Sequence, residues 1–155
     1  MFMKYALITG LLFFISCKKD SVTLSDTVFT NTTAHTIRVS GYTGGVVNAE
    51  SAFTLNANES KIVFSLNNRG VGNGLCFGEY YRFVDSIAVE FDGTFRMSHY
   101  KTGVVGNSIK KYDFSSSRNL FNENNYSRVI IKDVKYRREW NFTYRFTEQD
   151  YLDAK

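Results

Sequence analysis

The side chains of this chain that could carry chemistry are two histidines, two cysteines and scattered carboxylates. His35 and His99 lie far apart in the sequence and have no nearby ligand partners at metal-binding spacing. The chain contains no Gly-x-Ser-x-Gly nucleophile elbow, and it has neither a His-Glu-x-x-His nor a Cys-x-x-Cys motif. We therefore expect two isolated histidines, no bound metal, no cofactor and no enzymatic activity.

Asp85 and Glu90 are the acidic pair that could serve sugar hydrolysis, because that reaction needs two carboxylates across a glycosidic bond. Asp85 stands where a predicted strand begins, and strands commonly carry one solvated face. The favoured interpretation is therefore surface charge. An enzyme whose site the sequence does not reveal is the alternative.

The first sixteen residues form a segment of their own. A positive charge at Lys4 precedes an apolar stretch over residues 6–15, and the small residue Ser16 follows. This order is typical of a secretory signal that is removed from the mature protein. The apolar stretch is shorter than the roughly 20 residues of a membrane-spanning helix. We therefore expect residues 1–16 to be a signal peptide rather than a transmembrane anchor.

Residues 14–17, with the sequence Phe-Ile-Ser-Cys, resemble the lipobox of bacterial lipoproteins, although Phe14 stands where leucine is usual. The resemblance implies that Cys17 becomes the first residue of the mature chain and carries acyl chains on its sulfur and its nitrogen. A thiolate is the nucleophile that accepts the lipid, and several acyl chains make a durable anchor. We expect a membrane partner through lipid on Cys17; secretion without lipid is the alternative.

Removal of residues 1–16 leaves 139 of the 155 residues, which suffices for one domain with a sizeable core. The net charge falls from +4 to +3 with the loss of Lys4. The basic residues are scattered rather than striped, so we expect no nucleic-acid binding. Cys76 has no cysteine to pair with once Cys17 carries lipid, and we expect it to be a small buried apolar side chain.

The composition favours strands, because the 10 tyrosines and 14 phenylalanines fit a pleated, half-buried surface and proline is absent. Alternating apolar and polar residues predict seven or eight short strands, and Asp92-Gly93 between two of them predicts a hairpin. The expected strands cover residues 27–33, 36–42, 52–55, 61–66, 82–91, 94–100, 126–136 and 138–146. We expect one all-β domain over residues 27–155, an antiparallel β-sandwich, with a small β-barrel as the alternative.

Three further segments lie outside the expected strands. Residues 17–26 are polar and lack periodicity, so we expect a lipidated tether between membrane and domain. Residues 67–78 contain four glycines and predict a loop, either a plain connection or a ligand loop. Residues 147–150 fit a helix-capping pattern, but only five residues follow, so we expect at most one helical turn.

Aromatic rings are the candidate ligand-binding groups. They could stack on the apolar face of a sugar, because aromatic side chains combine apolar area with a polar tip. The candidates are Tyr80, Tyr81, Tyr100 and Trp140. Packing within the domain is the alternative for each, and it is favoured for Trp140 because that residue lies on an alternating strand.

Three segments resemble small lipoproteins of the Bacteroidota. They are residues 85–93 with the Asp-Gly hairpin, residues 118–126 with the sequence Asn-Glu-Asn-Asn-Tyr at their end, and the tail 144–154. The resemblance implies a lipid-anchored protein of the outer membrane, facing the periplasm or the cell surface. It transfers no catalytic residues. Lys18, directly after the cysteine, is consistent with sorting to the outer membrane.

Residues 20–22 and 26–28 resemble the three-residue O-glycosylation site of the same phylum, which is Asp, then Ser or Thr, then an apolar residue. Both triplets lie in the expected tether, where a glycosyltransferase could reach them. Ser21 and Thr27 are therefore candidate glycosylation sites, and unmodified tether residues are the alternative.

The favoured function is a noncatalytic, membrane-anchored domain that binds a partner protein or belongs to a cell-envelope assembly. The alternative is a carbohydrate-binding surface module. An exposed apolar patch would favour a protein partner, whereas a row of coplanar exposed aromatic rings on one sheet face would favour a sugar.

Overall fold

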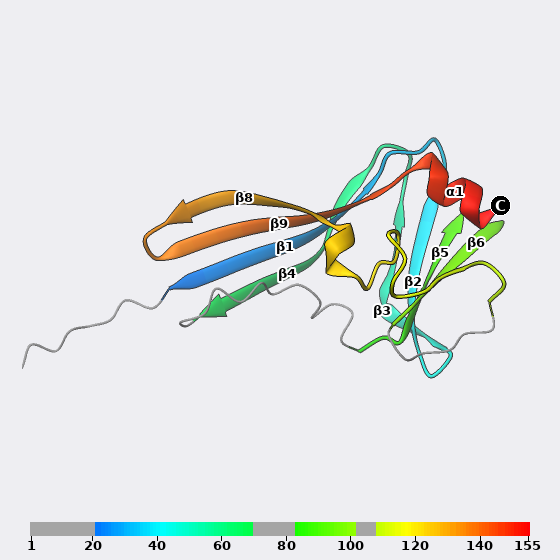
Figure 1. The fold of residues 1–155 in the computed structure, drawn as a ribbon, viewed down its shortest axis with the longest axis horizontal. Coiled ribbons are helices and arrows are strands. Elements are labelled where there is room, and N and C mark those ends of the chain that lie inside the picture. Colours follow the sequence, from blue (N-terminus) through cyan, green and yellow to red (C-terminus); the bar gives the residue numbers. More distant parts are fainter. Residues whose placement is uncertain (1–20, 70–82, 102–107) are drawn as a thin grey trace, which may run out of the picture.

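The computed structural model describes residues 21–69, 83–101 and 108–155, which form an all-β sandwich (Figure 1). A four-stranded and a five-stranded sheet pack together, and they do not close into a barrel. The predicted sandwich is confirmed, and the barrel alternative is wrong. The described ranges contain nine strands rather than seven or eight. The expected signal peptide and Cys17 lie outside these ranges, as do Cys76 and most of the glycine-rich segment.

The four-stranded sheet has the order β4-β1-β9-β8. Its strands are β1 (Val22–Asn31), β4 (Ser60–Arg69), β8 (Ser127–Val134) and β9 (Arg137–Phe146). The pairs β1–β4 and β8–β9 are antiparallel, but the central pair β1–β9 is parallel. The expectation of a purely antiparallel sandwich is therefore wrong, because the first strand and the last strand of the chain run side by side in the same direction.

The five-stranded sheet has the order β3-β2-β5-β6-β7. Its strands are β2 (Ile37–Thr43), β3 (Val46–Leu55), β5 (Ser86–Phe91), β6 (Phe95–Tyr100) and β7 (Lys111–Tyr112). The predicted hairpin at Asp92-Gly93 is confirmed: φ is 51° at Asp92 and 67° at Gly93, the left-handed values of the tight turns that match strand twist. The short pair β6–β7 is parallel.

The core lies between the sheets and is rich in aromatic rings. Along β1 the side chains alternate between half-buried and buried, and Phe29 is fully buried. Its ring meets that of Phe146 edge-on at 5.6 Å and that of Tyr144 at 6.0 Å. The five-stranded sheet covers these rings with Ile37, Phe91 and other fully buried apolar residues. The predicted alternation thus positions the core as expected for a sandwich.

A short helix, α1 (Glu148–Ala154), closes the chain and packs against β5 and β6. Thr147 and Asp150 form the predicted capping box, in which the Thr147 N–H donates to Asp150 Oδ2 at 2.8 Å. The helix has seven residues, so the expectation of at most one turn was wrong. Ala154 is buried in the core, and this packing stabilises a helix too short to be stable alone. No helix in the described ranges is long and apolar enough to cross a membrane.

Asp150 also forms a largely buried ion pair that ties α1 to the segment before the 3₁₀ helix η1 (Glu123–Asn125). Arg118 Nε donates to Asp150 Oδ1 at 2.8 Å, and the Asp150 side chain is only 5% exposed. The Arg118 guanidinium lies 4.8 Å from the centre of the Tyr144 ring, and the Tyr144 hydroxyl donates to the Arg118 carbonyl at 2.8 Å. Helix, loop and sheet thus share one polar network.

The four-stranded sheet extends beyond the sandwich as an arm (Figure 1). The arm consists of the start of β1, the end of β4 and the β8–β9 hairpin, and α1 lies at the opposite end of the molecule. The expected tether over residues 17–26 is too long, because β1 already begins at Val22. Thr23 and Ser25 are buried in this strand. Because these inward side chains are small and polar, the sequence shows no alternation of apolar and polar residues there.

Replacement of Arg118 by alanine should lower the free energy of unfolding by about 3 kcal/mol, because it leaves the buried Asp150 carboxylate without its cation. Chemical denaturation measures the loss. Arg138→Ala is the matched control: its partner Asp133 is 48% exposed, so the loss there should stay below about 1 kcal/mol. Equal losses in the two variants would contradict the assignment.

Candidate functional site

His99 is fully enclosed in the five-stranded sheet, where only 2% of the residue is exposed. Its Nδ1 accepts a hydrogen bond from the Leu120 N–H at 3.1 Å, and its ring meets that of Tyr112 edge-on at 5.2 Å. Burial, reinforced by the charge of Arg118, lowers the pKa of His99 to about 3. A neutral, enclosed imidazole that accepts a backbone hydrogen bond joins β6 to the Leu120 loop and has a structural role.

His35 is also held by its neighbours. Its Nδ1 lies 2.6 Å from Asp92 Oδ2, its Nε2 lies 3.6 Å from Glu148 Oε2, and its ring stacks on that of Tyr151 at 3.7 Å. The hydrogen bond from His35 lowers the pKa of Asp92. His35 therefore clamps the Asp-Gly turn to α1. In the described ranges no group of three or more His, Cys, Asp and Glu side chains can hold a metal ion.

The Asp85 carboxylate shapes a turn. Its Oδ2 accepts the Gly44 N–H at 2.7 Å and its Oδ1 accepts the Ser86 hydroxyl at 3.1 Å. Glu90 is half-buried on β5, opposite Arg38 on one neighbouring strand and Arg96 on the other. Asp85 therefore holds the turn at Gly44, and Glu90 lies on the five-stranded sheet between two arginines.

The four candidate stacking residues do not form one surface. Tyr80 and Tyr81 lie outside the described residues, and Tyr100 and Trp140 belong to different sheets. Trp140 is half-buried against the core, stacks on Phe142 at 6.4 Å and faces the Arg138 guanidinium at 6.0 Å. Trp140 thus packs within the domain, as the alternation along its strand indicated.

Tyr100 does border a hollow on the five-stranded sheet. The hollow has a volume of about 330 Å³, and its described lining includes Tyr42, Asp85, Arg96 and Tyr100. Tyr42 and Tyr100 both pair with Ser86 from opposite sides, so their backbones lie about 10 Å apart on two strands that flank β5. The Arg96 guanidinium covers the Tyr42 ring at 5.2 Å. The hollow combines aromatic and charged groups.

The two candidate glycosylation sites occupy different surroundings. Ser21 is half-buried and precedes β1, whereas Thr27 lies within β1 and is only 4% exposed. The expectation that Thr27 lies in an accessible tether is wrong, because the strand starts five residues before it and turns its side chain inward. Ser21 lies beside the tip of the arm, where it lines a small hollow with Thr23 and Asp133.

Strand β8 is the most exposed strand of the described fold, since every one of its residues is exposed. It forms an edge of the four-stranded sheet, and four of its eight side chains are large and apolar. Their exposed fractions are 51% for Val129, 48% for Ile130, 57% for Ile131 and 51% for Val134. An edge strand offers unpaired backbone N–H and C=O groups, so β8 combines hydrogen-bonding capacity with an apolar surface.

A bulge between Ile130 and Lys132 divides β8 into two halves. Charged side chains flank the apolar ones. Arg128 lies 3.6 Å from Glu123, and Arg138 of β9 lies 3.0 Å from Asp133. Bulges and charges on an edge oppose indiscriminate strand pairing. The bulge and the charges therefore protect this edge against unselective strand pairing.

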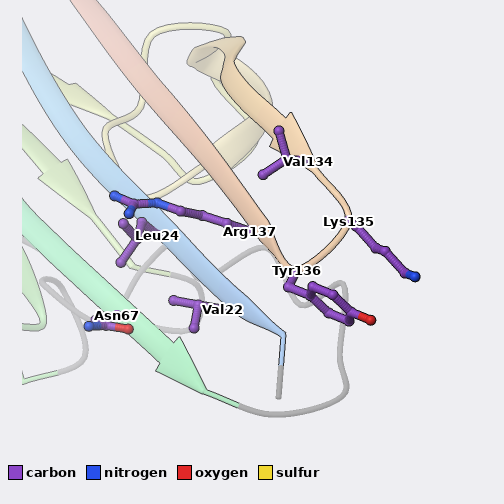
Figure 2. A pocket seen from close by; sticks show the side chains of 7 residues that line it. All are labelled: Val22, Leu24, Asn67, Val134, Lys135, Tyr136 and Arg137. Carbon is purple, nitrogen blue, oxygen red and sulfur yellow. The ribbon is translucent and has the colours of Figure 1, made fainter. Parts of the chain in front are cut away.

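An apolar groove of about 630 Å³ adjoins this edge at the tip of the arm (Figure 2). Its described lining is Val22, Leu24, Asn67, Val134, Lys135, Tyr136 and Arg137. In Figure 2 the Arg137 side chain extends over the sheet toward Leu24, whereas Lys135 and Tyr136 point outward from the turn. A second hollow, lined by Asp26, Ile131, Trp140 and neighbouring residues, continues along the arm.

No protein-family model, no curated protein and no solved structure matches this chain. The geometry of the described fold is the basis for the candidate site, which is the edge strand β8 with the adjoining groove. Sequence reasoning predicted a strand over residues 126–136 but did not identify it as a site. The signal available was the adjacent pair Ile130-Ile131, which breaks the alternation where the bulge lies.

The low pKa of His99 predicts that acid destabilises the fold. The unfolded chain protonates His99 near the ordinary value of 6.5 and the folded chain only at about 3. The contribution is therefore fully present above pH 6.5 and is lost as the pH falls toward 3, at up to about 1.4 kcal/mol per pH unit. Urea unfolding across this range should show a shallower pH dependence for His99→Gln than for the natural chain. Identical pH profiles would contradict the assignment.

Proposed function

We propose that this chain is a lipid-anchored, noncatalytic binding module of the cell envelope, and that it captures an extended segment of a partner protein along strand β8. The observation that carries the proposal is the exposed edge of β8, with its four half-exposed apolar side chains. Exposed apolar surface of this kind marks interaction sites in soluble domains.

Strand addition fits the chemistry of the edge. An added strand satisfies backbone groups of β8, and its alternating side chains provide selectivity. Ile131 and Val134 offer apolar contacts, whereas Lys132 favours an acidic residue opposite it. The partner segment is therefore an extended stretch of apolar residues with an acidic side chain.

The proposal of a lipid anchor is supported by the sequence. Residues 14–17 resemble a lipobox, and three segments of the chain resemble small Bacteroidota lipoproteins. Lipid on Cys17 would hold the domain at a membrane and raise the local concentration of partners in the same envelope.

Carbohydrate binding is the second candidate function, and the observation that favours it is the hollow between Tyr42 and Tyr100. A sugar ring could meet an aromatic face there and form hydrogen bonds with Asp85 or Arg96. Tyr100 is half-buried, however, and Arg96 already covers the Tyr42 ring. The described aromatic rings therefore do not form the open coplanar row that would place sugar first.

Replacement of Ile131 by lysine should lower partner binding roughly tenfold or more, because a charge would replace a central apolar contact. Ile62→Lys is the matched control: Ile62 is 56% exposed, against 57% for Ile131, and lies on β4 at the opposite edge of the sheet. The measurement is affinity capture of lipidated protein from native membranes, with a photo-crosslinking residue at position 131 or 62 to identify the contact.

Crosslinks from position 131 but not from position 62 would support the β8 edge. Equal capture by the two lysine variants would contradict it. A glycan array distinguishes the second candidate: a glycan that binds the natural chain, binds Ile131→Lys equally and is lost with Tyr100→Ala would place sugar binding first.

A further inference from the structure

We propose that the tip of the arm is a second, protein-borne membrane contact, which rests on anionic phospholipid headgroups beside the lipid anchor. The tip comprises Val22 and the turn residues Val134, Lys135, Tyr136 and Arg137. The inference builds on the proposed lipidation of Cys17 and adds a contact that lipidation alone does not require.

The first strand of the described fold begins at the tip. Val22, the first residue of β1, donates its N–H to the Tyr136 carbonyl at 2.9 Å. The same end of β1 pairs with Arg137 on β9 and Arg69 on β4. The start of β1 therefore lies beside the β8–β9 turn, as Figure 2 shows.

The chain between anchor and tip is short. Five residues lead from Cys17 to Val22, and a fully extended chain spans at most about 3.6 Å per residue. Val22 therefore lies within about 18 Å of the lipidated residue. The headgroup region on one side of a bilayer is about 5–8 Å thick, so the start of β1 lies no more than about 13 Å beyond the headgroups.

The tip combines apolar, aromatic and basic side chains. Tyr136 is 38% exposed and Val134 is 51% exposed, and both side chains belong to or adjoin the turn. The Lys135 ammonium lies 5.3 Å from the centre of the Tyr136 ring. Tyrosine is enriched at the level of lipid headgroups because its ring is apolar and its hydroxyl polar. A basic residue beside such a ring can pair with a lipid phosphate.

The charge of the tip indicates that the lipid surface it contacts is anionic. The basic residues of the arm are Arg69, Lys132, Lys135, Arg137 and Arg138, and the acidic ones are Asp26, Asp133 and Glu139. Asp133 pairs with Arg138 and Glu139 pairs with Arg137, so positive charge is in excess. At the opposite end, Asp150 of α1 is neutralised by Arg118, and the Lys110 ammonium donates to the Ala154 carbonyl of the same helix, which also carries Glu148 and Asp153. The tip is therefore the end that an anionic surface attracts.

The test uses the mature lipidated chain in vesicles of phosphatidylglycerol and phosphatidylcholine in equal parts. Hydrogen exchange of the backbone amides over residues 133–137 should be slower on these vesicles than on pure phosphatidylcholine. In the double variant Lys135→Glu, Tyr136→Ser this slowing should fall by more than about fivefold, because the loss of one lysine near an anionic surface alone lowers binding about fivefold and the new carboxylate adds repulsion. Lys111→Glu, at a half-exposed lysine of β7, is the matched control and should behave like the natural chain.

Two outcomes would overturn the proposal. One is equal exchange over residues 133–137 on anionic vesicles and on neutral vesicles. The other is equal behaviour of the double variant and Lys111→Glu. Unfolding midpoints of both variants verify that the fold is intact.

The anchor is tested separately by Cys17→Ser. This variant should leave the membrane fraction, whereas the double tip variant should stay in it because its lipid is intact. Retention of Cys17→Ser in the membrane fraction would contradict the proposed lipid anchor. If Cys17→Ser leaves the membrane fraction but exchange over residues 133–137 is equal on anionic and neutral vesicles, the lipid anchor stands and only the tip contact is contradicted.

Discussion

The parallel pairing of β1 with β9 is the interaction on which the rest of the structure depends. It aligns Val22–Asn31 with residues 137–146 over ten consecutive positions. One end of this pair supplies Phe29, Tyr144 and Phe146 to the core, and the other end forms the two central strands of the arm. Because both strands are central in their sheet, β8 is left as an edge. The start of β1 is also hydrogen-bonded to the β8–β9 turn, through the Val22 N–H and the Tyr136 carbonyl.

Sandwich and arm differ in how their side chains are used. In the sandwich, polar groups are enclosed and paired: His99 accepts a backbone hydrogen bond, and Asp150 binds Arg118. Among the described residues, no buried side-chain nitrogen or oxygen lacks a hydrogen-bond partner. In the arm, by contrast, apolar side chains are exposed along β8. A body with paired polar groups that presents an exposed edge strand supports the proposed binding role.

Local patterns in the sequence predicted local structure well. Asp92-Gly93 has the backbone conformation of a tight hairpin, and Thr147 with Asp150 caps the last helix. Both features depend on residues adjacent in sequence. The parallel partner of β1 was not predictable in this way, because alternation shows that a strand has two faces but does not identify its neighbour.

The start of β1 was missed for a different physical reason. Its inward residues Thr23, Ser25 and Thr27 are small and polar yet buried, so no apolar alternation marked the strand. The site was also only partly predictable: Trp140 proved to pack against the core, and exposure along β8 depends on its place at the edge of the sheet. That place is a property of the assembled fold, which no single segment encodes.

The proposed docking edge β8 is tested most directly by hydrogen exchange of its amides in lipidated protein, compared between native membranes and vesicles that hold the purified protein alone. We expect slower exchange over residues 127–134 in native membranes, with unchanged exchange in β5 and β6, because an added strand protects the edge. Equal exchange over residues 127–134 in the two settings would contradict it.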